Sequence, residues 1–163
     1  GYLWCFARVF VRTPSGRQRF NVLGALNALT KELTTVTNDT YITSIQVCKL
    51  LKLLAKNATR PITIVLDNAR YQRCKMVMQL AQELEIELLF LPPYSPNLNL
   101  IERLWKLVKK ECLYSIYYEN FSRFTGAIQA FLDNMGKTHQ EKLDSLLTLN
   151  FQMFTNEQFQ LAV

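Results

Sequence analysis

The spacing of apolar residues changes once along the chain, near residue 40. Before that point, runs rich in β-branched and aromatic residues are separated by turn residues, which is typical of strands. After it, apolar residues recur mostly every three or four positions, which is typical of amphipathic helices. Two short, continuous apolar runs interrupt the helical pattern and predict strands buried on both faces. The predicted strands span 2–12, 19–28, 33–37, 62–66 and 87–91. The predicted helices begin near Thr43 or Ser44 and then span about 73–85, 98–114, 122–134 and 140–149.

This order of elements predicts one mixed α/β domain. The first three strands are expected to form an antiparallel meander, with Pro14 and Gly16 in the first turn. The last two strands are joined through a helix and should therefore lie parallel in the sheet. A chain of 163 residues can build one such core and is short for two domains. We therefore expect a single sheet flanked by helices.

The helical patterns also predict which side chains face the core. Ile45, Cys48 and Leu51 recur at helical spacing in the first helix, opposite a row of lysines. That row is either a solvated helix face or a DNA contact. In the second helix, Met76 and Met78 are expected to pack in the core, and in the third, Leu104 and Trp105 are expected to pack against the sheet. The lysines of the row are Lys49, Lys52 and Lys56.

Composition narrows the class of protein without identifying it. The 49% hydrophobic and 20% charged content fits a folded globular chain, and a net charge of +6 favours a polyanionic partner. Four dispersed cysteines and one histidine argue against a zinc site and predict free thiols in a reducing cytoplasm. No apolar run reaches the roughly 18 residues that would cross a membrane. The first residues resemble neither a start nor a signal peptide, so we expect a longer parent protein.

Two carboxylates, Asp67 and Glu102, occupy positions typical of a ligand site. Asp67 follows the apolar strand 62–66 at its carboxyl end, where open α/β sheets bind ligands. Glu102 lies early in the helix that follows the next strand, and 34 residues separate the two acids. Their oxygens suit Mg²⁺ or Mn²⁺. Structural roles stay open, because Asp67 could form an Asx turn that caps the next helix and Glu102 could pair with Lys106.

Three stretches of the sequence resemble a known family. The blocks TIVLDNA (63–69) and LPPYSPNLNLIERLW (91–105) closely resemble signature blocks of DDE transposases, in particular the mariner-like group of bacterial insertion-sequence transposases. The segment PSGRQRFNVLGALN (14–27) resembles the second-strand region of that family. In the family, these blocks carry the second and third catalytic acids, which match Asp67 and Glu102.

The resemblance implies a ribonuclease-H-like fold and a two-metal mechanism, in which two Mg²⁺ or Mn²⁺ ions assist an in-line displacement at phosphorus. It implies that Asp67 and Glu102 are metal ligands, that Asn68 orients Asp67, and that Tyr94 lies near the site and touches DNA. Basic residues near these blocks are candidates for phosphate contacts or for a plain charged surface. They are Arg103, Lys106, Lys109, Lys110, Arg17 and Arg19.

The chain also departs from the family pattern. The first catalytic aspartate should lie on a strand upstream of 2–12, and no residue here matches it; Asp39 lies in a turn after the third strand. The helix-turn-helix module that binds the element ends is not matched either. We therefore expect residues 1–163 to be a catalytic domain without its first strand, inactive alone. The parent would be a cytoplasmic, nucleoid-associated homodimer acting on element ends and target DNA, with no membrane partner. The alternative is an inactive transposase remnant with at most weak DNA binding.

Overall fold

The computed structural model describes residues 18–92, 98–114 and 116–149. The predicted strand 2–12 and the turn that follows it lie outside these residues. The described chain folds in the order ββαβαβααα, as the apolar pattern predicted for this part of the sequence. Element types are therefore confirmed over this region, while several ends differ by a few residues.

The first described element is an antiparallel hairpin of β1 (Asn21–Leu26) and β2 (Leu33–Asn38). Polar side chains hold the chain at both ends of this hairpin. Asn21 is buried, and its side chain donates to Asn38 Oδ1 and to the Thr40 carbonyl, at 2.8 and 2.9 Å. At the turn, Asn27 Oδ1 accepts from two backbone N–H groups. The predicted strand 19–28 therefore ends earlier, at Leu26.

Helix α1 (Ser44–Asn57) follows, and Thr43 begins it with a capping box in which Gln46 takes part. The predicted core face of this helix is wrong in part. Ile45 is 57% exposed, whereas Val47, Leu50 and Leu51 are buried. Val47 and Leu51 lie one turn apart and pack in one hydrophobic cluster with residues of α2 and of the parallel strands. The buried face of α1 is therefore rotated about the helix axis from the predicted face, which began at Ile45. The lysine row of this helix is exposed, as predicted.

The next unit is a parallel pair, β3 (Ile62–Leu66) and β4 (Ile86–Phe90), joined through α2 (Lys75–Glu83). The predicted parallel pairing is confirmed. Burial of these strands on both faces is wrong, because Val65 and Leu89, which are register partners, are 45% and 52% exposed. Among the described residues, one face of this pair packs, against α1 and α2.

Core packing of the two α2 methionines is also wrong. Met76 and Met78 are both about half exposed, while Val77 between them is fully buried. Successive residues of a helix are turned by about 100°, so the two neighbours of an inward residue point away from the core. The described strands form two separate two-stranded sheets, and no hydrogen-bonded ladder joins them within the described part of the chain. A single continuous sheet therefore stays an expectation.

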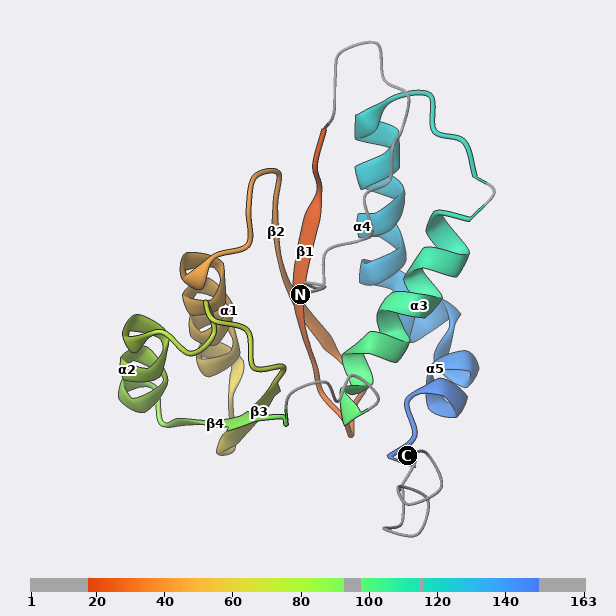
Figure 1. The fold of residues 1–163 in the computed structure, drawn as a ribbon. Coiled ribbons are helices and arrows are strands. Elements are labelled where there is room, and N and C mark those ends of the chain that lie inside the picture. The colour runs from red at the N-terminus through yellow and green to blue at the C-terminus, as the bar shows by residue number, and fades with distance from the viewer. Residues whose placement is uncertain (1–17, 93–97, 115, 150–163) are drawn as a thin grey trace, which may run out of the picture.

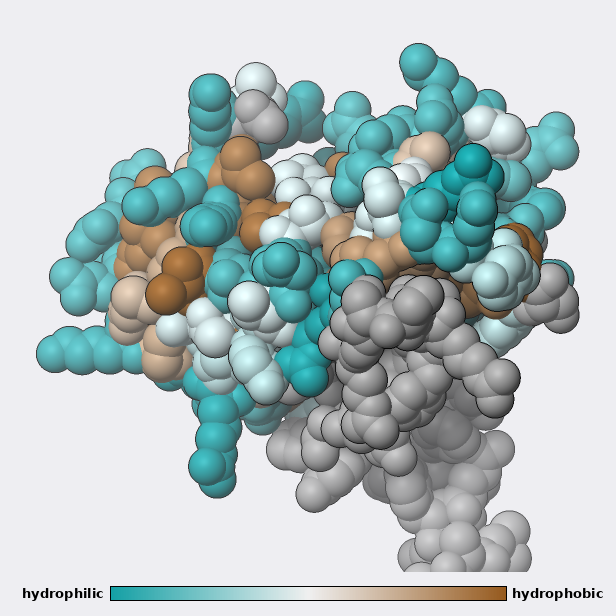
Figure 2. Space-filling model, turned by 90° about the horizontal axis from the view of Figure 1, so that it is seen from above, coloured by the Kyte–Doolittle hydropathy of each residue, from teal (hydrophilic) through white to brown (hydrophobic). Residues whose placement is uncertain are grey.

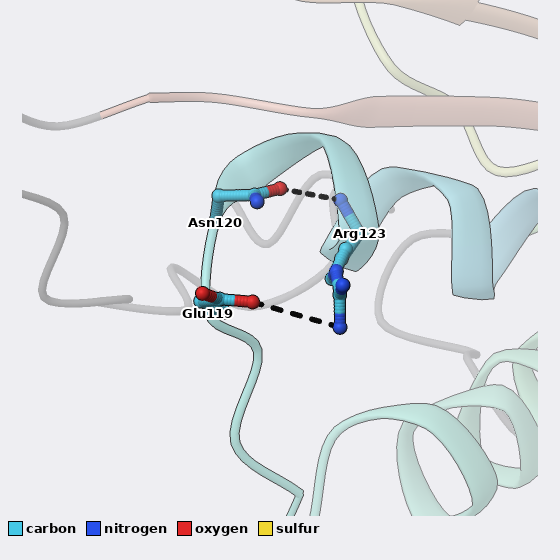
Figure 3. A network of polar contacts seen from close by, with 3 residues as sticks. All are labelled: Glu119, Asn120 and Arg123. Carbon is cyan, nitrogen blue, oxygen red and sulfur yellow. Dashed lines mark hydrogen bonds and ion pairs between the residues drawn. The ribbon is translucent and has the colours of Figure 1, made fainter.

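Three helices complete the fold: α3 (Leu100–Cys112), α4 (Phe121–Thr138) and α5 (Gln140–Leu146). Helix α4 is longer than predicted. Asn120 caps it by accepting from the Arg123 N–H at 2.9 Å (Figure 3). The ion pair between Glu119 and Arg123 is 3.6 Å long and largely exposed, so it contributes little. The cap, rather than the ion pair, defines this helix start.

The hairpin lies between two groups of helices (Figure 1). Val22 belongs to a hydrophobic core shared with α3, α4 and α5. Its neighbour Leu23 packs against a second core, formed by α1, α2 and the parallel strands. Adjacent residues of a strand point to opposite faces, so β1 contributes to both cores. Leu33 of β2 also packs against the first core, and α1 contacts both strands, so the hairpin as a whole links the two halves of the described fold.

Helix α3 meets β1 through Trp105 and Gly24. A Cβ atom at Gly24 would lie 3.0 Å from Trp105 Cη2 and Cζ2, and 3.2 Å from Ile101 Cδ1. Because Gly24 has no side chain, the buried indole of Trp105 packs directly against the backbone of β1. Packing of Leu104 and Trp105 against the rest of the fold is confirmed, since they are 0% and 6% exposed.

The surface is mostly hydrophilic when viewed from above (Figure 2). The largest group of apolar residues on this face lies at the left, on the side of α1 and α2 (Figure 2). None of the helices in the described chain is both long enough and apolar enough to cross a membrane.

We predict that Gly24→Ala destabilises the fold by roughly 1–3 kcal/mol, because the added methyl group overlaps with Trp105. The measurement is the free energy of unfolding from urea titration. Gly126→Ala is the matched control, since a Cβ there meets nothing within 4 Å and the residue lies inside α4. It should stabilise the fold by about 0.5–1 kcal/mol. Equal effects of the two substitutions would contradict the packing described for Trp105.

Candidate functional site

Asp67 is the first residue after β3, where the chain leaves the strand. It directly follows Leu66, whose carbonyl accepts from the Leu91 N–H at 2.8 Å at the same end of the parallel pair. Helix α2 does not begin until Cys74, which caps it without a side-chain hydrogen bond. Asp67 is therefore not the cap of α2, whereas an Asx turn at Asp67 stays open. The carboxylate lies at the carboxyl edge of the parallel strands, as predicted.

The side chain of Gln72 holds the carboxylate of Asp67. Gln72 Nε2 donates to Asp67 Oδ1 at 2.7 Å, and Gln72 Oε1 accepts from the Ala69 N–H at 3.1 Å. Sequence reasoning did not single out Gln72, because one glutamine in a loop carries no periodic signal. Asn68, expected to orient Asp67, has a buried Oδ1 without a hydrogen-bond partner in the described chain. Its role stays a prediction.

Glu102 lies in the first turn of α3, as predicted, and its N–H donates to the carbonyl of Asn99, the N-cap residue. The residues that follow it, Leu104 and Trp105, are buried and fix the rotation of the helix. Burial raises the pKa of Glu102 from 4.5 to about 7, and the negative charge of Asp67 adds to this rise. The two carboxylates are thus close enough to repel each other.

The donor set fits a divalent cation. Two carboxylates that repel each other are relieved by a positive charge between them, and oxygen donors are what Mg²⁺ and Mn²⁺ prefer. The unpaired Asn68 Oδ1 is a further oxygen acceptor beside Asp67. Within the described residues no three acidic, histidine or cysteine side chains form a group that could hold a metal. Asp67 and Glu102 could therefore offer two carboxylate ligands, and their role as metal ligands stays a prediction.

The predicted basic residues differ in their surroundings. The charges of Lys106 and Lys109 act on Glu102 and oppose the rise of its pKa, so both lie near the carboxylate pair. Lys110 instead acts on Glu111. Lys106 and Lys110 are exposed, and Lys109 is half-buried. A DNA contact by any of them stays a prediction.

Two of the predicted arginines make contacts within the fold. Arg103 donates to the carbonyls of Leu146 and Thr148, at 3.4 and 2.9 Å, at the end of α5. Arg19 lies 4.3 Å above the ring of Tyr41 and donates to a backbone carbonyl. These contacts give both arginines a structural role. Arg17 and Tyr94 lie outside the described residues.

Comparison with known proteins places the chain in a family. Residues 7–125 match a family described as DDE superfamily endonuclease. No curated protein matches. A chain in the cryo-electron microscopy structure of the simian T-cell lymphotropic virus intasome in complex with PP2A regulatory subunit B56 gamma is similar, with 18% identity and a TM-score of 0.50. That match covers 88% of this chain and 46% of the intasome-complex chain, so the present chain spans less than half of its length.

The catalytic core domain of BIV integrase is a second similar structure, with 18% identity, a TM-score of 0.48 and coverage of 78% of this chain and 80% of that one. The similarity to the intasome-complex chain shows the fold. The mixed α/β, ribonuclease-H-like class expected from the sequence is confirmed at that level, whereas the order of strands in one sheet is not shown.

We predict that Glu102→Gln changes how stability depends on pH. The folded pKa of about 7 lies above the ordinary 4.5, so the folded chain keeps a proton that the unfolded chain releases between these values. The parent chain therefore loses stability as pH rises through this window, and the loss is complete above about pH 7. The Glu102→Gln variant does not lose stability in this way, because the glutamine side chain does not titrate. Because Glu102 is partly solvated, the effect is smaller than the full pKa shift implies. The free energy of unfolding of the variant, relative to that of the parent, should rise by on the order of 1 kcal/mol from about pH 4 to pH 8.

The measurement is urea unfolding of both chains at the two pH values. Glu111→Gln is the matched control on the same helix, because a hydrogen bond from Lys142 lowers the pKa of Glu111. A lowered pKa contributes stability above the ordinary value, so this variant should lose stability relative to the parent as pH rises. The same pH trend in both variants would contradict the environment described for Glu102.

Proposed function

Because the chain belongs to the DDE superfamily endonuclease family, we propose that Asp67 and Glu102 are two of its catalytic metal ligands. The reaction is cleavage and strand transfer of insertion-element DNA, as in transposases of the mariner-like bacterial group. The blocks around the two acids, 63–69 and 91–105, support this assignment. The family match covers both blocks.

One observation of the structure carries the proposal. Asp67 and Glu102 are separated by 34 residues in sequence, yet the fold places one directly after β3 and the other in the first turn of α3. Burial raises the pKa of Glu102, and the charge of Asp67 adds to this rise. A fold gains no stability from bringing two carboxylates together in a partly buried place. Such an arrangement is typical of a site that is completed by a cation.

The residues of the chain have distinct tasks in this site. Asp67 and Glu102 would hold the cation from two different elements, the end of β3 and the first turn of α3. When bound, a divalent cation polarises a phosphate oxygen and lowers the pKa of a bound water. Lys106 and Lys109 supply positive charge next to the carboxylates, where they attract the DNA backbone and limit the repulsion between the acids.

The complete site needs a third carboxylate. The family resemblance implies an aspartate on a strand upstream of 2–12, and we propose that the parent protein supplies it. The DNA partners would be the element ends and the target, bound by a homodimer of the full-length protein. The similar chain from an intasome complex is compatible with a role on DNA ends. Without the third ligand, the alternative is an inactive remnant with weak DNA binding.

We predict that Asp67→Ala and Glu102→Ala each reduce cleavage by more than about 100-fold, because loss of a direct metal ligand should exceed the 10–100-fold effect typical of outer-shell partners. The measurement is Mg²⁺-dependent nicking of DNA that carries the element ends, using the protein in its full natural length. Chelation of the metal should abolish the same activity.

Glu111→Ala is the control, since Glu111 lies on the same helix but hydrogen-bonds to Lys142. It should cleave at the parental rate. Undiminished cleavage by either the Asp67 or the Glu102 variant would refute the assignment of that residue. DNA binding without any metal-dependent nicking by the parent protein would favour the remnant instead.

A further inference from the structure

We propose that Cys48 and Cys74 are a redox-responsive pair, which hydrogen peroxide converts to a disulfide within one chain. The link would tie α1 to α2. Both thiols are free in the structure, and neither cysteine belongs to the catalytic site proposed above. The inference therefore does not depend on metal binding by Asp67 and Glu102.

The fold brings the two cysteines together from different elements. Cys48 lies in α1, and Cys74 is the N-cap of α2. Both pack against the same hydrophobic cluster, which the two helices build with the parallel strands. Each cysteine comes three residues before a fully buried member of that cluster, Leu51 in α1 and Val77 in α2. Residues three apart share one face of a helix, so both cysteines lie on the sides that face this shared cluster.

The electrostatics also indicate that the two sulfur atoms are neighbours. Burial raises the pKa of the Cys48 thiol, and the charge of the Cys74 thiolate adds to this rise. Water and salt screen such an effect beyond about 10 Å, so the two sulfur atoms lie near each other. Lys52, one turn after Cys48 on α1, opposes the rise and favours the thiolate form of Cys48.

The surroundings of the cysteines predict which thiol reacts first. Cys48 and Cys74 are each half-buried, whereas Cys112 is 4% exposed in the other core. Burial raises the pKa of Cys112 to about 11, so this thiol is rarely ionised. Cys74 lies at the N-terminus of α2, where the helix dipole favours a negative charge, and its side chain makes no capping hydrogen bond. We therefore expect Cys74 to be oxidised first.

The reaction balances with one molecule of hydrogen peroxide. The Cys74 thiolate attacks a peroxide oxygen, the O–O bond breaks, and the products are a sulfenic acid and hydroxide. The Cys48 thiolate then attacks the Cys74 sulfur, so that the S–S bond forms and the sulfenic oxygen leaves as hydroxide. The two protons released by the thiols convert both hydroxide ions to water. Two thiols are oxidised to one disulfide, and the peroxide is reduced to two water molecules.

The test is oxidation of the 163-residue chain with hydrogen peroxide. At roughly 10 µM chain, the link within one chain should form about 100-fold faster than links between chains, because neighbouring thiols have an effective concentration on the order of 1 mM. The remaining thiols are alkylated in denaturant, and the unreduced chain is digested and analysed by mass spectrometry. A Cys48–Cys74 link that dithiothreitol reverses is expected. Cys112 should carry the alkyl group and is the internal control.

Two variants separate the steps of the reaction. In Cys48→Ser, peroxide should leave Cys74 as a sulfenic acid, which dimedone traps. In Cys74→Ser, peroxide should leave Cys48 mostly reduced, because the thiol that reacts first is gone. Alanine replaces serine in either variant if the serine form fails to fold. Dimedone labelling of Cys112 as strong as that of Cys74 would contradict the selectivity proposed for the pair.

The dependence on the fold provides the last control. In concentrated urea the same oxidation should give a mixture of links, since the fold no longer selects one pair of thiols. The oxidised folded chain should unfold at a higher urea concentration than the reduced chain, because the link closes the segment 48–74 in the unfolded state. Oxidation of the folded chain without a Cys48–Cys74 link, or with the same mixture of links as in urea, would overturn the proposal. So would an excess of links between chains.

Discussion

The contact between Trp105 and Gly24 is the constraint on which the candidate site depends. It fixes α3, and with it Glu102, against β1. On the other face of the same strand, Leu23 packs into the core that α1 shares with the parallel strands, and Asp67 follows one of these strands. A strand without any functional side chain is thus the common support for both carboxylates.

The electrostatics of the site follow from this packing. Hydrophobic burial of α3 brings Glu102 toward Asp67, and the resulting repulsion opposes folding rather than assisting it. Lys106 and Lys109 reduce the repulsion, and Gln72 donates a hydrogen bond to Asp67. In a cation site without its cation, like charges lie close together and repel each other. Favourable packing elsewhere in the fold, here the burial of α3, offsets that repulsion.

The sequence predicted local structure well and side-chain surroundings less well. Periodicity located the described helices and strands, and the helix between β3 and β4 correctly implied their parallel pairing. The buried faces at Ile45, Met76 and Val65 were wrong, because apolar residue type alone does not tell which side of an element meets a neighbour. Gln72 could not be predicted, since its partners are set by a loop conformation. The positions of Asp67 and Glu102 could be predicted because one acid follows a strand and the other begins a helix, whereas their role as metal ligands came from the family resemblance and stays a prediction.

The central claim is that Asp67 and Glu102 share one cation. The most direct measurement is the anomalous diffraction of Mn²⁺ in crystals of the chain soaked with the ion. A shared cation should give a peak at ligand distance from carboxylate oxygens of both residues, and Asp67→Asn should remove that peak. A peak that touches neither residue, or separate peaks on each without a shared ion, would contradict it.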